Sequence, residues 1–175
     1  MLHRLSTLAH QFRVDREAVL RTVSGPVLVW GAVPAQPTSV ARAQGPTLNG
    51  RRPQTGSAEP VVFEARPRSN GGTLEATVGR GPECDIVLAE PTVSRMHARF
   101  RQEPHTGLWS VTDLGSQNGT YQNGVLILPG RPAPLFRRAA LRLGSAEVLF
   151  LQACAFEEYL RSYSQPSPVR LTRGG

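Results

Sequence analysis

The amino-acid sequence predicts a mainly β fold with short helical extensions at both termini. Between residues 61 and 152, runs of strand-forming residues alternate with polar segments that carry turn residues. Two turn signals, Asn118-Gly119 and Asn123-Gly124, lie five residues apart and leave too few residues between them for a helix. Apolar residues at helical spacing occur near the two ends of the chain, which places the predicted helices outside the β region.

Residues 1–33 are predicted to form an N-terminal helical extension that ends in a short strand. Apolar residues fall at helical spacing at Leu2, Leu5, Leu8 and Phe12. Asp15 is suited to cap a second short helix. The apolar run Val27-Leu28-Val29-Trp30 predicts a strand, which we expect to pack onto the main domain because an exposed apolar edge is a liability.

The remaining flanking segments are a linker, a helix and a tail. Residues 34–60 are rich in Pro, Gly, Gln, Ser and Thr without hydrophobic periodicity, which predicts a largely disordered linker. Residues 153–163 predict a helix that docks on the domain or on the N-terminal helices. Its apolar face consists of Phe156, Tyr159, Leu160 and Tyr163. Residues 164–175 contain two prolines and are expected to form a flexible tail.

Three polar blocks interrupt the β pattern at Val78-Gly79-Arg80, Ser94 to Ala98 and Asp113 to Gly124. Each block lies next to a predicted strand, and loops on a rigid sheet commonly carry binding residues. Arg80 offers a permanently charged planar fork, Ser94 a hydroxyl donor, and Asn118 an amide that donates and accepts hydrogen bonds. Together they suit a dianionic group and the peptide backbone beside it.

The order and spacing of these blocks, together with the run Glu83 to Leu88, resemble those of a forkhead-associated (FHA) domain. The resemblance covers residues 61–152, a little over half of the chain. It implies an eleven-stranded β-sandwich whose loops at one end bind a phosphothreonine peptide. It also implies a signalling role of the bacterial type.

The resemblance implies a phosphopeptide-binding role for five residues. Arg80 would contact the phosphate and the neighbouring peptide backbone, and Ser94 would donate to a phosphate oxygen. Asn118 would hold the peptide main chain. Arg95 follows the serine and would also reach the phosphate, and Gln117 occupies a position where other family members use threonine or serine.

Other residues of the blocks would support the binding loops. His97 would hold the loops from behind, and Asn123 would brace a neighbouring loop. Glycines would allow sharp turns or close approach of another segment, which a Cβ would hinder. The predicted supporting set is Gly79, His97, Gly119, Thr120, Asn123 and Gly124.

These features predict an adaptor that reads phosphothreonine on a partner marked by an upstream Ser/Thr protein kinase. Phosphorylation adds about −1.5 to −2 charge, and each charge-assisted hydrogen bond contributes about 1.5–3 kcal/mol, so unphosphorylated threonine should bind barely at all. The alternative is a phosphorylation-independent interaction scaffold with the same fold. A further hypothesis is self-association or autoinhibition through a phosphorylated linker threonine (Thr38, Thr47 or Thr55) or tail serine.

The sequence argues against catalysis, metal binding and cofactors. Ser94, His97 and Asp113 could be assigned as nucleophile, base and acid, but no nucleophile elbow surrounds Ser94 and no kinase signature is present. The four histidines lack zinc-ligand spacing. Cys84 and Cys154 are far apart in sequence and are expected to be reduced and partly buried.

Charge and hydropathy give two further expectations. The formal charge is +7, but every basic residue is arginine and the arginines are spread along the chain, so we expect no nucleic-acid partner. No run approaches the roughly 20 apolar residues of a membrane helix, and the first residues do not resemble a signal peptide. We therefore expect a cytoplasmic protein without a membrane partner.

Overall fold

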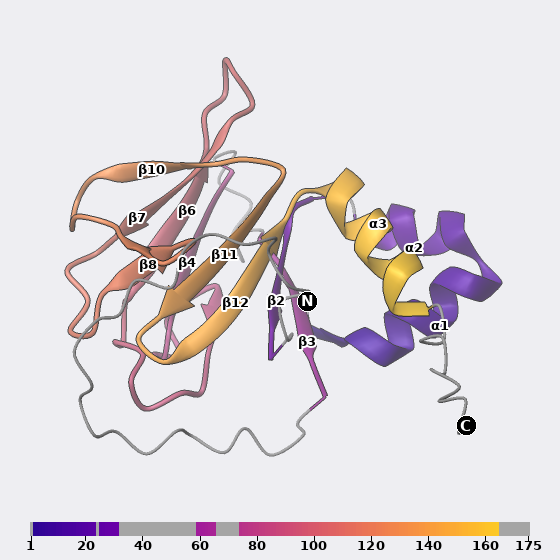
Figure 1. Ribbon diagram of the computed structural model, residues 1–175, viewed down its shortest axis with the longest axis horizontal. Helices are drawn as coiled ribbons and strands as arrows, with labels where there is room; N and C mark the ends of the chain where they lie inside the picture. The colour runs from indigo at the N-terminus through magenta and orange to yellow at the C-terminus, as the bar shows by residue number, and fades with distance from the viewer. Residues whose placement is uncertain (1, 24, 32–58, 66–73, 165–175) are drawn as a thin grey trace, which may run out of the picture.

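The computed structural model describes residues 2–23, 25–31, 59–65 and 74–164, which form twelve strands in two sheets and three helices (Figure 1). The seven-stranded sheet runs in the order β1 (Leu2–Arg4), β3 (Val61–Glu64), β2 (Val27–Trp30), β12 (Ala146–Leu151), β11 (Arg138–Leu143), β8 (Thr120–Gln122) and β9 (Val125–Leu126). The five-stranded sheet runs in the order β10 (Pro132–Leu135), β7 (Trp109–Asp113), β6 (Ala98–Gln102), β4 (Glu75–Gly79) and β5 (Ile86–Val87). The predicted mainly β fold of two packed sheets is confirmed.

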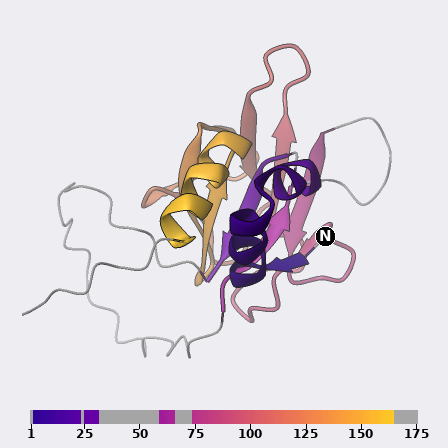
Figure 2. The ribbon, with the colours of Figure 1, turned by 90° about the vertical axis from the view of Figure 1, so that its right-hand side faces the viewer.

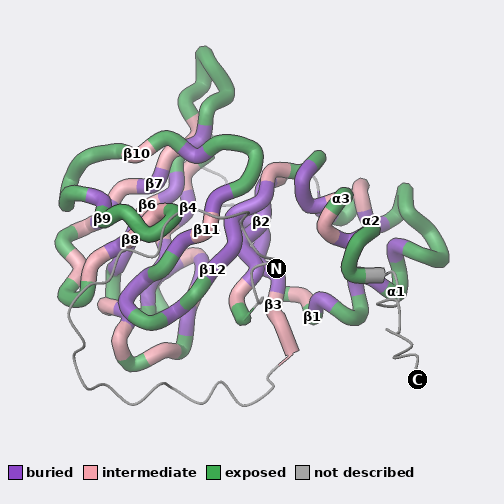
Figure 3. The backbone as a smooth tube through the Cα atoms, viewed as in Figure 1, coloured by how far each residue is buried: buried purple, intermediate pink, exposed green. Residues whose placement is uncertain are grey.

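The main hydrophobic core lies between the two sheets. Residues along β7 and β11 alternate in burial, as expected for strands with one face in a core. The ring of Phe100 in one sheet stacks on Phe150 in the other at a centroid distance of 6.1 Å, and Trp109 lies 6.4 Å from Phe150. Figure 3 shows the buried segments along the strands and the exposed segments along the loops.

Strand β2 lies inside the seven-stranded sheet. The sequence places Val27–Trp30 in the N-terminal extension and begins the domain at residue 61, whereas the strand pairs antiparallel with both β3 and β12. Leu28 joins the core between the sheets, while Val27 and Val29 point to the opposite face. The unbroken apolar run follows from burial on both faces.

Two helices follow β1 at the N-terminus, α1 (Leu5–Val14) and α2 (Arg16–Thr22). The predicted cap of the second helix is confirmed, because an Asp15 carboxylate oxygen accepts a hydrogen bond from Ala18 N at 2.9 Å. The placement of Leu2 on the first helix is wrong. Leu2 belongs to β1, pairs with Phe63 of β3 and is 63% exposed, because the backbone is extended up to Arg4.

The helices cover the outer face of the seven-stranded sheet, where they form a second hydrophobic cluster (Figures 1 and 2). The predicted C-terminal helix is confirmed as α3 (Ala153–Ser164), and its Phe156 and Leu160 are fully buried. They pack with apolar residues of α1 and α2 and with Val29 and Leu149 of the sheet. The helix therefore docks on both of the predicted surfaces. Tyr163 remains 44% exposed.

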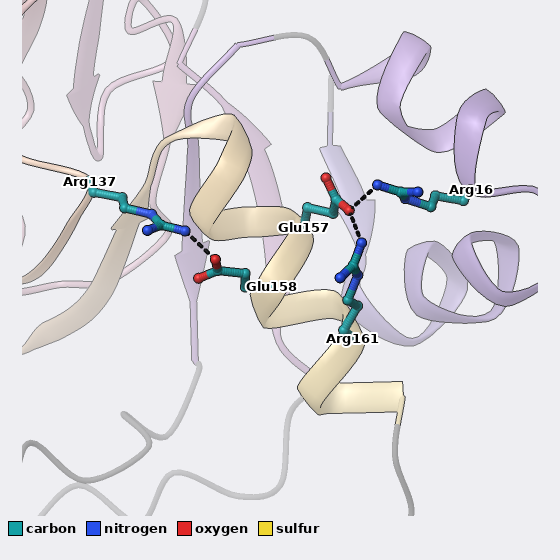
Figure 4. Close-up of polar contacts among 5 residues, drawn as sticks. All are labelled: Arg16, Arg137, Glu157, Glu158 and Arg161. Atoms are coloured by element: carbon teal, nitrogen blue, oxygen red, sulfur yellow. Dashed lines mark hydrogen bonds and ion pairs between the residues drawn. The ribbon is translucent and has the colours of Figure 1, made fainter.

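Ion pairs surround α3 (Figure 4). Glu157 accepts from Arg16 of α2 and from Arg161 of α3, both at 2.5 Å, and Glu158 pairs with Arg137 beside β11. These ion pairs lie at the solvent-exposed surface, where water screens them and their contribution to stability is small. The buried apolar residues therefore account for most of the stabilisation of this helix.

The predicted flanking segments are described only in part. Residues 34–58 and 165–175, with Thr38, Thr47 and Thr55, lie outside the described residues. Pro60, at the end of the predicted linker, accepts a hydrogen bond from Leu5 N at 2.9 Å. Neither cysteine forms a disulfide, and Cys84 is buried whereas Cys154 is exposed. In the described part of the chain, no helix is long and apolar enough to span a membrane.

Replacing Phe156 by alanine should lower the free energy of unfolding by about 3–5 kcal/mol, because it removes a fully buried ring from the cluster under the helices. Chemical denaturation of the full chain measures the change. Tyr163→Ala, on the same helix but largely exposed, is the matched control and should change stability by less than about 1 kcal/mol. Equal losses in the two variants would contradict the packing role of α3.

Candidate functional site

The three polar blocks meet at one end of the five-stranded sheet. Strands β4, β6 and β7 are antiparallel neighbours, so the end of β4, the start of β6 and the end of β7 lie at the same edge. Arg80 N donates to Ser94 O at 2.9 Å, and Gln117 N donates to Ser94 Oγ at 3.0 Å. The structure thus brings the predicted phosphate-contacting residues together.

Two successive backbone carbonyls hold the most important side chains of the site. Arg80 Nε donates to Val93 O at 3.2 Å, and Asn118 Nδ2 donates to Thr92 O at 2.8 Å. Both side chains remain exposed, so the remaining guanidinium donors and the Asn118 amide oxygen can face a ligand. Arg80 and Asn118 are therefore oriented before any ligand arrives.

Thr92 is in turn held by residues that the sequence did not single out. Its hydroxyl accepts from Ser145 N at 2.8 Å and lies 2.7 Å from Ser145 Oγ, and Glu90 Oε1 lies within 3.2 Å of both hydroxyls. Gly144 has φ +59°, and a Cβ there would lie 2.5 Å from Thr92 O. The pair Gly144-Ser145 between two apolar runs is a hairpin signal that could have located this turn.

The buried carboxylate of Asp113 organises the loop that carries Gln117 and Asn118. It accepts from Gly115 N at 2.8 Å, Ser116 N at 2.9 Å, Ser116 Oγ at 2.6 Å and Thr120 Oγ1 at 2.5 Å. Burial raises the pKa of Asp113, but the hydrogen bonds from Ser116, Thr120 and Gly115 outweigh burial and lower the pKa below its usual value. The loop therefore closes around an ionised carboxylate.

His97 is fully buried behind the site and contacts two of its loops. Ser94 N donates to His97 Nδ1 at 3.0 Å, and Nε2 lies 3.3 Å from Gly119 O. These contacts require a neutral ring with the proton on Nε2. Burial lowers the pKa of His97, and this effect outweighs the opposite influences of the Gly119 carbonyl and the Asp113 charge.

Close backbone approach and positive φ angles explain why glycine or asparagine occupies the remaining supporting positions. A Cβ on Gly79 would overlap the Arg95 carbonyl, so a side chain there would displace the segment that carries Ser94 and Arg95. Asn123 and Gly124 have φ +50° and +85° and form the two-residue turn between β8 and β9. Asn123 Oδ1 accepts from Ala140 N of β11 at 3.0 Å.

Arg95 and Gln117 take part in different ways. The Arg95 guanidinium lies 3.3 Å from Glu83 Oε1 and is 75% exposed. Gln117 is exposed, and its backbone N–H donates to Ser94 Oγ. Because Ser94 Oγ accepts from Gln117 N, the Ser94 hydroxyl proton can point to an incoming acceptor.

The combined chemistry suits binding of an anion. Two guanidinium groups, a hydroxyl and a primary amide surround the same edge of the sheet, and such groups donate hydrogen bonds to oxyanions. Ser94, His97 and Asp113 do not form a proton relay, because His97 contacts the backbone N–H of Ser94 and the Asp113 carboxylate bonds to Ser116 and Thr120. Among the described residues, no group of three His, Cys, Asp or Glu could hold a metal ion.

Comparisons with known proteins agree with this geometry. A protein-family model described as "FHA domain" matches residues 76–144. The oxoglutarate dehydrogenase inhibitor of Corynebacterium diphtheriae is 55% identical over 47 residues, which cover 27% of this chain and 32% of that protein. The glycogen accumulation regulator GarA of Mycolicibacterium smegmatis is 41% identical over 75 residues, which cover 43% of this chain and 44% of that protein.

Solved structures give weaker likenesses. The FHA domain of the CT664 protein from Chlamydia trachomatis is 21% identical, covers 73% of this chain and 96% of that chain, and has a TM-score of 0.49. Full-length yeast Pml1p is 24% identical, covers 73% of this chain and 81% of that chain, and also has a TM-score of 0.49.

The chain contains an FHA domain, which the family model places within residues 76–144. This confirms the family to which the sequence motifs pointed. The chain matches less than half of the length of each of these two bacterial relatives.

Replacing Thr92 by valine should lower the free energy of unfolding by about 1–2 kcal/mol, because the shape is kept but the hydroxyl contacts to Ser145 and Glu90 are lost. Thr92→Ser keeps the hydroxyl and should lose less. Denaturation of the two variants measures the difference, and hydrogen exchange should show faster exchange of Gln117 N and Ser145 N in Thr92→Val. A larger loss in Thr92→Ser would contradict the role of the hydroxyl.

The lowered pKa of His97 predicts a pH dependence of stability. Folding favours the neutral ring, so this contribution is complete above the unfolded pKa of about 6.5 and is lost as the pH falls through the lower folded pKa. The free energy of unfolding of the wild type should therefore fall between pH 7.5 and 5.5. His97→Gln should show a smaller fall over this range, and His105→Gln, an exposed control, should behave as wild type. Parallel curves for all three proteins would refute the titration of His97.

Proposed function

We propose that this chain is a phosphothreonine-peptide-binding module that acts as a cytoplasmic adaptor in Ser/Thr kinase signalling. The observation that carries the proposal is the preset orientation of Arg80 and Asn118 by the carbonyls of Val93 and Thr92, together with the Ser94 hydroxyl that accepts from Gln117 N. These are the donors that a phosphate and the peptide main chain beside it require. The FHA family match supports the same reading.

Each side chain has a distinct part in the proposed recognition. Arg80 and Ser94 bind phosphate oxygens, Arg95 adds a second positive charge, and Asn118 binds the peptide backbone next to the phosphothreonine. Gln117 acts through its backbone N–H, which positions Ser94. Two or three charge-assisted bonds of about 1.5–3 kcal/mol each are enough to make binding depend on the phosphate.

The partner proposed for this site is a protein phosphorylated on threonine by a separate Ser/Thr kinase. The relatives named as an enzyme inhibitor and as a regulator of glycogen accumulation support a regulatory binding role without catalysis. No nucleic-acid or membrane partner enters this proposal. Self-association through a phosphorylated linker or tail is a further hypothesis for the same site.

One observation favours the alternative function, a phosphorylation-independent scaffold. Val125, Leu126 and Leu128 are between 50% and 71% exposed, and they line a groove of about 330 Å³ with Pro132 and Pro134. Exposed apolar residues that cluster in one place are typical of protein-interaction surfaces. Such a surface would bind a partner whether or not the partner is phosphorylated.

Arg80→Ala should reduce binding to a degenerate phosphothreonine peptide library at least tenfold, because one to two charge-assisted bonds are lost. The full chain is titrated with the phosphorylated and unphosphorylated libraries. Arg101→Ala is the matched control, since Arg101 is an exposed arginine at the far end of β6. Wild type and control should bind the phosphorylated library alone. Equal binding of both libraries by the wild type would replace the adaptor with the scaffold, and absence of binding would reject phosphopeptide recognition.

A further inference from the structure

The ion pair between Glu83 and Arg95 places a negative charge at the proposed phosphate site. Arg95 directly follows Ser94, whose hydroxyl is a proposed phosphate donor, and the Arg95 guanidinium lies 3.3 Å from Glu83 Oε1. The Glu83 side chain is 40% exposed, so water and ligand can reach this pair. A phosphate that needs Arg95 must therefore compete with a carboxylate of this chain.

The backbone holds the segment of Glu83 against the phosphate-binding loop. Gly81 N donates to Arg95 O at 3.0 Å, and Arg80 N donates to Ser94 O at 2.9 Å. Cys84 N donates to Gly81 O at 3.2 Å, which folds Glu83 back over the start of the loop. Glu83 therefore lies beside the residues that carry the site and is not a distant surface charge.

Gly81 leaves the space that the Glu83 carboxylate occupies. A Cβ on Gly81 would lie 2.5 Å from the carboxyl carbon and from both carboxylate oxygens of Glu83. Its φ is outside the range that disfavours other residues, and the crowded atoms are the end of a flexible side chain. Alanine at this position would therefore move the Glu83 carboxylate at little strain.

We infer that Glu83 is an internal competitor that holds Arg95 away from the phosphate and sets the affinity of the site. The inference rests on the proposed phosphopeptide function. In the free chain Arg95 pairs with Glu83, and in the complex it pairs with phosphate while Glu83 turns to solvent. The Glu83 carboxylate repels a dianionic phosphate more strongly than a singly charged aspartate, because the repulsion grows with the charge of the ligand.

Two independent substitutions test the competitor. Glu83→Gln removes the charge, and Gly81→Ala displaces the carboxylate without changing the charge of the chain. The binding assay uses the degenerate phosphothreonine library as a fluorescently labelled peptide pool. An exposed ion pair of this kind has a modest free energy, so each variant should lower the Kd for this phosphothreonine pool about two- to fivefold. Glu103→Gln, an exposed glutamate in the hairpin at the far end of β6, removes the same charge at a distance and should leave the Kd within twofold of wild type.

Combining the Glu83 substitution with a substitution of Arg95 gives the decisive test. In an Arg95→Gln background the gain from Glu83→Gln should shrink at least twofold, because the two residues act on the same phosphate contact. Glu83→Gln should also widen the preference for the phosphothreonine pool over a matched aspartate pool, because the dianion gains more than the monoanion from loss of the Glu83 charge. Thermal denaturation of each variant establishes that all are folded at the assay temperature.

The outcomes separate this inference from the proposed function. Failure of the wild type to bind the phosphothreonine pool would reject both. Phosphate-dependent binding by the wild type, with Glu83→Gln and Gly81→Ala unchanged or weaker, would overturn the competitor while leaving the phosphopeptide function intact. A gain in Glu83→Gln that persists in the Arg95→Gln background would also overturn the inference, since a general charge effect would then explain it.

Discussion

The hydrogen bonding of one buried carboxylate determines the shape of the proposed binding edge. Asp113 ends β7, and its two oxygens accept from two backbone amides and two hydroxyls of the next seven residues. An ionised carboxylate in a protein interior is stable only with such partners. These bonds tie the chain at Gly115, Ser116 and Thr120 to one point, which positions Gln117 and Asn118 between them.

A second set of contacts connects this loop to both sheets. Asn118 donates to Thr92 O, and Thr92 is held by Ser145 in the turn between β11 and β12. His97, directly before β6, contacts the loops of Ser94 and Gly119 from the core. The proposed site therefore derives its rigidity from the five-stranded sheet through His97 and Asp113, and from the seven-stranded sheet through Ser145. Loops held in this way on a packed sandwich lose little further entropy on binding.

The sequence predicted the strands beside the polar blocks, the caps and turns, and the convergence of the blocks, because these follow from local residue chemistry. It did not predict the position of β2 in the sheet or the contacts of Glu90, Thr92 and Ser145. These arise between segments up to 55 residues apart in sequence. A four-residue apolar run indicates burial but not its neighbours. In the sequence, Glu83 stood out only as the first residue of the run Glu83 to Leu88, since a single charge carries no signal of its partner.

The binding residues differ in how firmly the free chain holds them, and this difference has a physical consequence. Arg80, Ser94 and Asn118 bond to backbone groups of Val93, Gln117 and Thr92, so a ligand finds them in place. Arg95 bonds to a side chain that is itself flexible and partly exposed. The three preset side chains offer the same hydrogen bonds to any phosphorylated ligand. The contact between Arg95 and Glu83 can exchange for a contact with the ligand, so the affinity can be adjusted there without altering the fold. Affinity can therefore be adjusted at Arg95 and Glu83 with less effect on the loops than at Ser94 or Asn118, whose side chains bond to the backbone of Gln117 and Thr92.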